Sequence, residues 1–126
     1  MLLTSNEIVE KAKVRIKEVD AQDFLLNMDK YVVIDVREKN ELDDGYIDGS
    51  VHIPRGTLEM NILKLLSDTL KVTNIEHQPI MLYCRTGARS ALSADALQGM
   101  GFKEVYSLAG GFKKWQELDY PTVSKK

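Results

Sequence analysis

The chain contains 126 residues, which fits a single domain, because domains commonly contain roughly 100 to 150 residues. Hydrophobic residues make up 44% and charged residues 29% of the sequence, a composition typical of globular proteins that argues against extensive disorder. The formal net charge of -2 gives no electrostatic reason to expect a nucleic acid or an anionic membrane as a partner.

The N-terminus does not resemble a targeting segment. Residues 1–4 are largely apolar, but the polar residues 5–7 interrupt them far too soon for a secretory signal. No stretch approaches the roughly 20 apolar residues of a transmembrane helix. We therefore expect a cytoplasmic protein.

A short helix is predicted over residues 6–13, with Ser5 as its N-cap. We treat residues 1–13 as a helical extension that precedes the main domain, which we place at residues 14–126.

From residue 14 onwards, strand-like and helix-like segments alternate. Strands are predicted over residues 14–19, 31–36, 51–53, 80–83 and 104–108. Helices are predicted over residues 21–26, 38–44, 57–70, 90–100 and 112–118, with Asp20 and Thr57 as N-caps. This alternation predicts an α/β fold with a parallel sheet and helices on both faces. The tail, residues 123–126, is expected to be solvated.

Two of the predicted strands, 31–36 and 80–83, are continuously apolar, as expected for strands covered on both faces of a parallel sheet. Ligands of such sheets bind beyond the carboxyl ends of the strands. Asp35 and Arg37 lie at the end of one of these strands and Cys84 follows the other. We expect these side chains to lie close together.

Cys84 is the only cysteine in the chain. A lone cysteine is often a buried, inert side chain, but this one stands between a strand and a glycine-containing loop at the start of a predicted helix. The loop runs through Cys84, Arg85, Thr86, Gly87, Ala88, Arg89 and Ser90. Its main-chain N–H groups could surround the sulfur as a nest, and cations and a helix N-terminus both favour the nucleophilic thiolate.

The side chains of the loop predict binding of an anion. Arg85 and Arg89 place full positive charges where an anionic substrate would approach. Ser90 could cap the helix and hydrogen-bond the loop, and it has two possible roles, as a plain N-cap or as a catalytic residue.

The sequence of residues 84–90 resembles the active-site loop of the single-domain rhodaneses, the thiosulfate sulfurtransferase family. Other family signatures are resembled in the same order by residues 33–38 with Glu41, by residues 45–54, and by residues 108–112 with Trp115. The resemblance covers about residues 14–121. It departs from the family at Tyr46, Asp48 and Ser50, where His, Pro and Ala are usual, and these departures concern the details of a turn.

The resemblance implies a five-stranded parallel sheet and a transferase mechanism centred on Cys84. Cys84 would take a sulfane sulfur from thiosulfate or a similar small anionic donor as a persulfide, and pass it to cyanide or to a small-molecule or protein thiol. No cofactor is implied beyond this covalent persulfide. His52 and His77 are too few to predict a metal site, and His52 is expected at the surface.

Asp35, Arg37 and Glu41 each allow two interpretations. Asp35 could cap the following helix, and Arg37 with Glu41 could form a local ion pair of small stabilising value. The resemblance favours a supporting role, in which these side chains brace the active-site loop without contacting the substrate.

Three other functions compete with the sulfurtransferase. Related folds use a cysteine-to-arginine loop as a phosphatase or arsenate reductase, but that loop is one residue longer than the four residues between Cys84 and Arg89. A non-catalytic regulatory rhodanese module would typically lack the cysteine. A polysulfide-binding sulfur carrier is the third alternative, because residues 55–59 resemble a segment of polysulfide-sulfur transferases.

Overall fold

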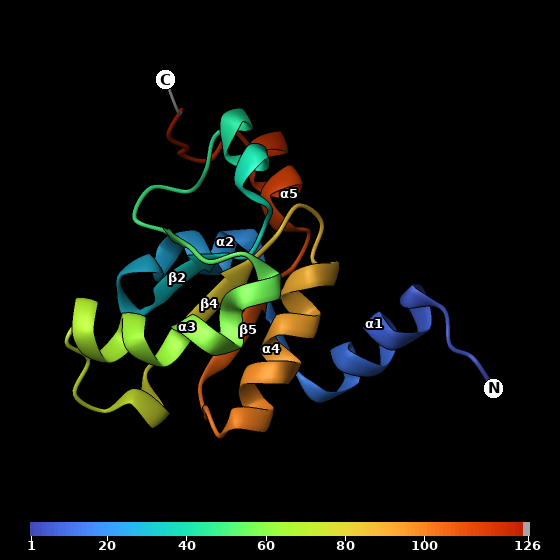
Figure 1. Ribbon diagram of the computed structural model, residues 1–126. Coiled ribbons are helices and arrows are strands. Elements are labelled where there is room, and N and C mark those ends of the chain that lie inside the picture. Colours follow the sequence, from blue (N-terminus) through green and yellow to red (C-terminus); the bar gives the residue numbers. More distant parts are fainter. Residues whose placement is uncertain (125–126) are drawn as a thin grey trace.

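The computed structural model describes residues 1–124 and contains a five-stranded, all-parallel sheet in the order β1-β5-β4-β2-β3 (Figure 1). The strands are β1 (Lys17–Val19), β2 (Val32–Asp35), β3 (Val51–His52), β4 (Ile80–Tyr83) and β5 (Val105–Leu108). The predicted α/β fold is therefore confirmed, with β4 as the central strand.

Within residues 1–124, five α-helices and several short 3₁₀ or π turns precede, connect or follow the strands. The α-helices are α1 (Ser5–Arg15), α2 (Ala21–Leu26), α3 (Leu58–Lys64), α4 (Ala88–Met100) and α5 (Gly111–Glu117). The remaining helical turns are Met28–Lys30, Lys39–Asp44, Arg55–Thr57, Leu65–Thr69 and Ile75–His77. Within residues 1–124, no helix is long and apolar enough to cross a membrane.

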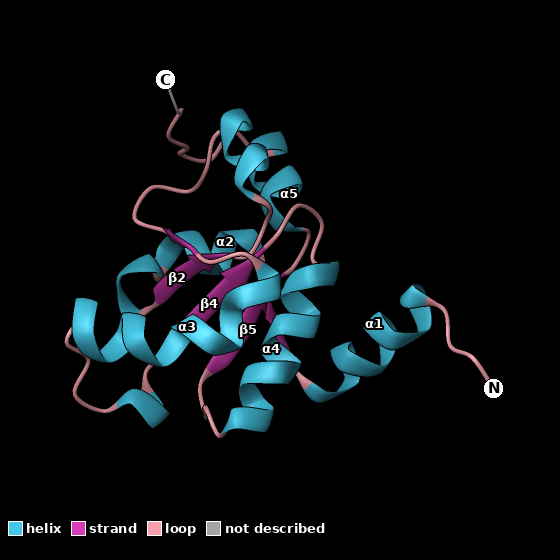
Figure 2. Cartoon of the chain, viewed as in Figure 1, coloured by secondary structure: helices cyan, strands magenta, loops and turns pink. Residues whose placement is uncertain are grey.

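The sheet separates two hydrophobic cores, because side chains alternate between the two faces of each strand. On β4, Ile80 and Leu82 pack with residues of α3 and α4, whereas Met81 and Tyr83 pack with Phe24 of α2 and with residues of α5. Figure 2 shows α3 and α4 in front of the magenta strands and α2 behind them. Helices therefore cover both faces, which accounts for the continuous apolar run of β4.

Helix α1 lies against α4 and not on the sheet (Figure 1). Its buried residues are Val9 and Ala12, and Arg15 binds both carboxylate oxygens of Asp95 on α4, at 2.9 and 2.7 Å. The prediction placed residues 14 and 15 in a strand, but they form the last turn of this helix.

The cap of α1 also differs from the prediction. Thr4, not Ser5, is the N-cap: its hydroxyl accepts a hydrogen bond from the Glu7 N–H, and the Glu7 carboxylate accepts one from the Thr4 N–H. This reciprocal capping box satisfies two N–H groups at once, which Ser5 inside the first turn could not do.

The predicted helix over residues 57–70 is divided in two. An α-helix ends at Lys64 and continues as a wider π turn over Leu65–Thr69. Thr57 makes no capping hydrogen bond, because its hydroxyl points back to the carbonyl of Pro54, at 3.4 Å.

The C-terminal tail is not wholly solvated as predicted. Val123 pairs with Tyr46 in an antiparallel bridge, with N–H···O distances of 2.8 and 3.0 Å in the two directions. Ser124 is exposed. The last part of that prediction, residues 125–126, lies outside the described residues.

Candidate functional site

Cys84 lies at the carboxyl end of the central strand, next to the end of β2. Tyr83 pairs with Asp35 in the sheet register, and the Val36 N–H donates to the Tyr83 carbonyl at 2.9 Å. The fold therefore places the backbone of Cys84 next to the chain segment that carries Asp35 and Arg37.

Three hydrogen-bonding groups surround the sulfur of Cys84. The N–H groups of Gly87 and Ser90 point at Sγ, at 3.1 and 3.4 Å, and Ser90 Oγ lies 3.5 Å away. Only 1% of the residue is exposed. Main-chain N–H groups directed at a sulfur favour its anionic form, because they supply partial positive charge without competing water.

The start of α4 differs from the prediction and explains this geometry. The helix begins at Ala88, and Gly87, with a φ of 109°, occupies the N-cap position. Ser90 is therefore inside the first turn and does not cap the helix, so that one of its two predicted roles is wrong. Its N–H and hydroxyl both face Cys84, and Ser90 Oγ also lies 2.7 Å from Ser107 Oγ.

Helix α5 holds the loop from behind. The N–H of Phe112 donates to the Cys84 carbonyl at 2.8 Å, and the N–H of Lys113 donates to the Arg85 carbonyl at 2.9 Å. In a trans peptide the N–H points away from the C=O, so these two bonds fix the direction of the next two N–H groups, those of Arg85 and Thr86.

Gly111 makes this close approach possible. Its φ is +59°, and a Cβ built on it would lie 2.5 Å from the Arg85 carbonyl oxygen and 2.6 Å from that of Cys84. In the sequence, residues 110–111 stand out only as part of the resemblance carried by residues 108–112. A pair of glycines directly before a helix was the available signal, but only the fold shows which backbone they approach.

Arg89 and Glu41 form an ion pair that joins the loop to the turn Lys39–Asp44. The Arg89 guanidinium binds both carboxylate oxygens of Glu41, at 2.6 and 2.9 Å. These hydrogen bonds lower the pKa of Glu41 to about 2 despite its partial burial, and they raise the pKa of Arg89. The predicted local ion pair between Arg37 and the carboxylate of Glu41 is therefore wrong, because that carboxylate binds Arg89. Much of the positive charge of Arg89 is directed at Glu41, whereas the side chain of Arg85 is exposed.

Arg37 and Asp35 form a buried ion pair at the carboxyl end of β2. The Arg37 guanidinium donates to the two Asp35 oxygens at 2.7 to 3.1 Å and to the Gly45 carbonyl at 2.8 Å, and it stacks 4.4 Å from the centre of the Phe112 ring. Burial lowers the pKa of Arg37, but Asp35 more than offsets this and the pKa is raised. The two residues are 2% and 0% exposed, so the pair lies in the interior of the protein.

In the turn after Gly45, where the sequence departs from the family, the side chain of Ser50 and the backbone of Ile47 contact the hydroxyl of Tyr83. Ser50 Oγ lies 3.0 Å from the Tyr83 hydroxyl, which also accepts the Ile47 N–H at 3.0 Å. Burial raises the pKa of Tyr83 further above its ordinary value. His52 lies at the end of β3, as predicted, and is partly exposed, with Nε2 2.7 Å from the Arg37 carbonyl oxygen.

The ion pair between Glu41 and Arg89 should make the stability of the protein depend on pH in the acidic range. Because the pKa of Glu41 is lower in the folded state, its contribution is present above about pH 4.5 and is lost as the pH falls towards 2. We expect Glu41→Gln to lower the free energy of unfolding by roughly 1 to 3 kcal/mol at neutral pH, with a difference from wild type that shrinks with acidification.

Urea unfolding of wild type and Glu41→Gln between neutral pH and pH 3 measures this difference. Glu59→Gln is the matched control, because Glu59 forms a more exposed pair with Arg55 and its loss should cost less than about 1 kcal/mol. A difference between wild type and Glu41→Gln that did not change with pH would contradict the assignment.

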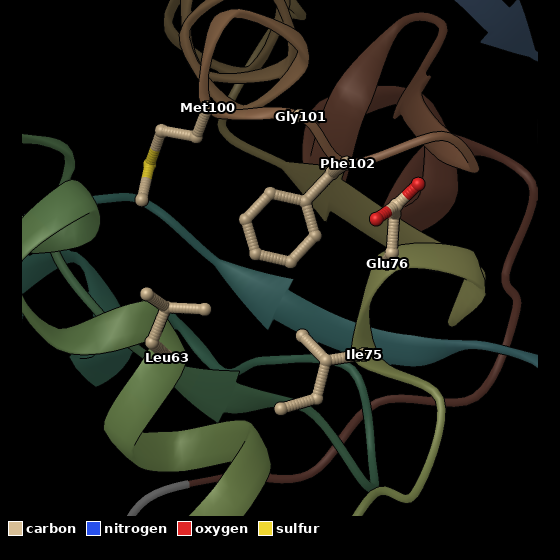
Figure 3. Close-up of a pocket in the computed structure, with 6 residues that line it drawn as sticks. All are labelled: Leu63, Ile75, Glu76, Met100, Gly101 and Phe102. Carbon is tan, nitrogen blue, oxygen red and sulfur yellow. The ribbon is translucent and has the colours of Figure 1, made fainter.

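A separate pocket of about 200 Å³ lies at the other end of α4 (Figure 3). Its lining is mostly apolar and consists of Leu63, Ile75, Glu76, Met100, Gly101 and Phe102. α4 contains 13 residues and is thus about 20 Å long, which separates this pocket from the cysteine loop at the start of the helix. Among the described residues, no group of three or more His, Cys, Asp or Glu side chains is arranged to hold a metal ion.

Known proteins resemble this chain in sequence and in structure. The thiosulfate sulfurtransferase GlpE of Stutzerimonas stutzeri is 33% identical over 91 residues, which cover 72% of this chain and 74% of that protein. The polysulfide-sulfur transferase homodimer of Wolinella succinogenes superposes with a TM-score of 0.75 and 30% identity, over 94% and 86% of the two chains.

A third match is a protein of unknown function from Rhodopseudomonas palustris, described as a possible tyrosine phosphatase. It superposes with a TM-score of 0.81 at 27% identity and covers 98% of this chain and 96% of its own. Residues 20–118 match the rhodanese-like domain, and this range includes the cysteine loop, the Asp35–Arg37 pair and the start of α5. The chain therefore belongs to the rhodanese-like domain family.

Proposed function

We propose that the protein is a sulfurtransferase that carries sulfur as a persulfide on Cys84. One observation carries the proposal: the sulfur of the only cysteine is buried at the base of a loop whose N–H groups, those of Gly87 and Ser90, point at it. Such a site stabilises a sulfur anion, which is the attacking species and also the charged form of the product persulfide.

The reaction proceeds in two displacements. The Cys84 thiolate attacks the outer sulfur of thiosulfate, the S–S bond of thiosulfate breaks, and sulfite leaves with the bonding electron pair. A thiolate or cyanide then attacks the outer sulfur of the persulfide, the new S–S bond breaks, and the Cys84 thiolate is regenerated. Because the two substrates never have to be bound together, the kinetics are ping-pong.

The burial of Cys84 supports a small donor. With 1% of the residue exposed, a bulky group cannot reach Sγ, whereas a bound sulfur extends the side chain by about 2 Å towards the acceptor. Arg85, which is exposed in the same loop, supplies a positive charge for an anionic donor. The acceptor is a small-molecule or protein thiol, and a cytoplasmic setting, where thiols are kept reduced, suits this role.

Polysulfide is the second candidate donor, because the polysulfide-sulfur transferase of Wolinella succinogenes matches almost the whole chain. Arg55 begins the segment 55–59 that resembles polysulfide-sulfur transferases. Its N–H donates to the Val36 carbonyl at 3.0 Å, next to the end of β2, and its side chain is about one-third exposed. A polysulfide chain would leave a shorter polysulfide in place of sulfite, and the persulfide on Cys84 would be the same.

Steady-state transfer from thiosulfate to cyanide tests the proposal. We expect thiocyanate formation with parallel double-reciprocal plots, complete loss of turnover in Cys84→Ser, and no hydrolysis of an aryl phosphate. Replacing thiosulfate by polysulfide in the same assay identifies the preferred donor. Cys84-dependent phosphate release without thiocyanate formation would replace this function by that of a phosphatase.

A further inference from the structure

The hydroxyl group of Ser107 lies beneath the active-site loop, in a position that is otherwise apolar. On β5, Val105 and Ser107 share the face covered by α4, and Val105 belongs to the apolar core there. Ser107 is 0% exposed, and among residues 1–124 its hydroxyl has one hydrogen-bond partner, Ser90 Oγ, at 2.7 Å. A buried hydroxyl is costly unless it is hydrogen-bonded, so the contact with Ser90 determines which way its proton points.

Ser90 connects this hydroxyl to the reactive sulfur. Its Oγ lies between Ser107 Oγ, at 2.7 Å, and Cys84 Sγ, at 3.5 Å. Each serine hydroxyl has one proton to donate, so the three atoms allow two orders of donation. In one order the thiol donates to Ser90 and Ser90 to Ser107, and in the other Ser107 donates to Ser90 and Ser90 to the sulfur.

The two orders differ in how many of the thiol and hydroxyl protons are donated in a hydrogen bond. When the sulfur carries its own proton and donates it to Ser90, the proton of Ser107 has no acceptor among its described neighbours. When the sulfur is an anion, both hydroxyl protons are donated along the chain and every proton is used. An unsatisfied buried donor is penalised, so this arrangement favours the anion.

We propose that Ser107 is a positioning residue that stabilises the Cys84 thiolate and persulfide through a two-hydroxyl relay with Ser90. Its relevance to catalysis rests on the proposed sulfurtransferase function, but its effect on the thiol does not. Switching between the two orders needs only rotation of two hydroxyl groups, so the relay follows the charge of the sulfur without movement of the backbone.

The charged groups around the sulfur are not altered by a change at Ser107. Arg89 interacts electrostatically with Cys84 from the first turn of α4, and Glu41 is paired with Arg89. Arg85 lies in the loop itself, and Asp35, the last residue of β2, is paired with Arg37 two residues later. A change in the ionisation of Cys84 in a Ser107 variant would therefore report on the two hydroxyl groups and not on these charges.

The test is the pH dependence of Cys84 alkylation by iodoacetamide, together with the ultraviolet absorbance of the thiolate. Because the chain has one cysteine, both signals report on Cys84 alone. We expect Ser107→Ala to lower the alkylation rate at neutral pH about 10-fold, to move the pH profile upwards, and to leave the plateau rate at high pH unchanged. Ser107→Thr, which keeps a hydroxyl, should restore the wild-type profile.

Ser93→Ala is the matched control. Ser93 is also a fully buried serine, but its hydroxyl donates to the Arg89 carbonyl at 2.7 Å and not towards the sulfur. Its profile should match that of wild type. A Ser107→Ala profile that superimposes on wild type, or a lower plateau without a pH shift, would overturn the relay. If the pH shift occurs while the wild-type protein fails to transfer sulfur, the relay stands and the proposed function fails.

Discussion

Replacement of Gly111 by alanine is expected to lower kcat/KM for sulfur transfer about 100-fold, because it displaces the loop that surrounds Cys84. A Cβ at this position would lie 2.5 to 2.6 Å from the carbonyl groups of Arg85 and Cys84, which are main-chain atoms that cannot turn aside. The loop or α5 must shift, and the N–H groups directed at the sulfur shift with them. Steady-state kinetics on protein shown to be folded by circular dichroism measures the effect.

Gly101→Ala provides the control for backbone strain. Gly101 also has a positive φ, +110°, but a Cβ there would meet nothing within 4 Å. Gly101→Ala should lose about 1 kcal/mol of stability from the left-handed conformation and keep its activity, whereas Gly111→Ala should lose more stability because of the added clash and should also lose activity. A Gly111→Ala protein with kcat/KM within about 2-fold of wild type would show that α5 does not hold the loop in its active geometry.

Removal of Arg37 is expected to have the largest effect on stability. Arg37→Ala leaves the Asp35 carboxylate at 0% exposure without its ion pair, and such a change costs about 3 to 5 kcal/mol. It also removes the contact with the Gly45 carbonyl and the stacking on Phe112. Urea unfolding at neutral pH gives the free-energy difference.

Arg15→Ala is the matched comparison for Arg37→Ala. Arg15 also binds an aspartate through both oxygens, but 55% of its side chain is exposed, so its loss should cost less than about 1 kcal/mol. Equal losses of unfolding free energy in Arg37→Ala and Arg15→Ala would mean that the contribution of the Asp35–Arg37 pair to stability does not depend on its burial.

Local patterns in the sequence were sufficient for the parts of the fold that depend on neighbouring residues. The apolar run of β4 predicted its bounds at residues 80–83, and Asp20, whose carboxylate accepts the Asp23 N–H at 2.8 Å, marked the start of α2. Residues 14–16 were misassigned, because a short alternating segment fits both a strand and an amphipathic helix. The capping box at Thr4 and the contact of Arg15 with Asp95 favour the helix.

Interactions between distant parts of the chain could not be predicted in the same way. Glu41 lies 48 positions before its partner Arg89, and the local alternative with Arg37 was the one that spacing could offer. The approach of Gly111 to the loop and the contact of Ser107 with Ser90 likewise depend on β5 lying beside β4. The sequence predicted which residues gather at this edge of the sheet, whereas their pairing depends on the three-dimensional arrangement.

The most direct measurement of the central claim is the intact mass of the protein after incubation with thiosulfate in the absence of reducing agents. We expect wild type to gain the mass of one sulfur atom, and cyanide to remove it with release of one equivalent of thiocyanate. Cys84→Ser should gain nothing. A wild-type protein whose mass stays unchanged, or a Cys84→Ser protein that gains the same mass, would contradict a persulfide on Cys84.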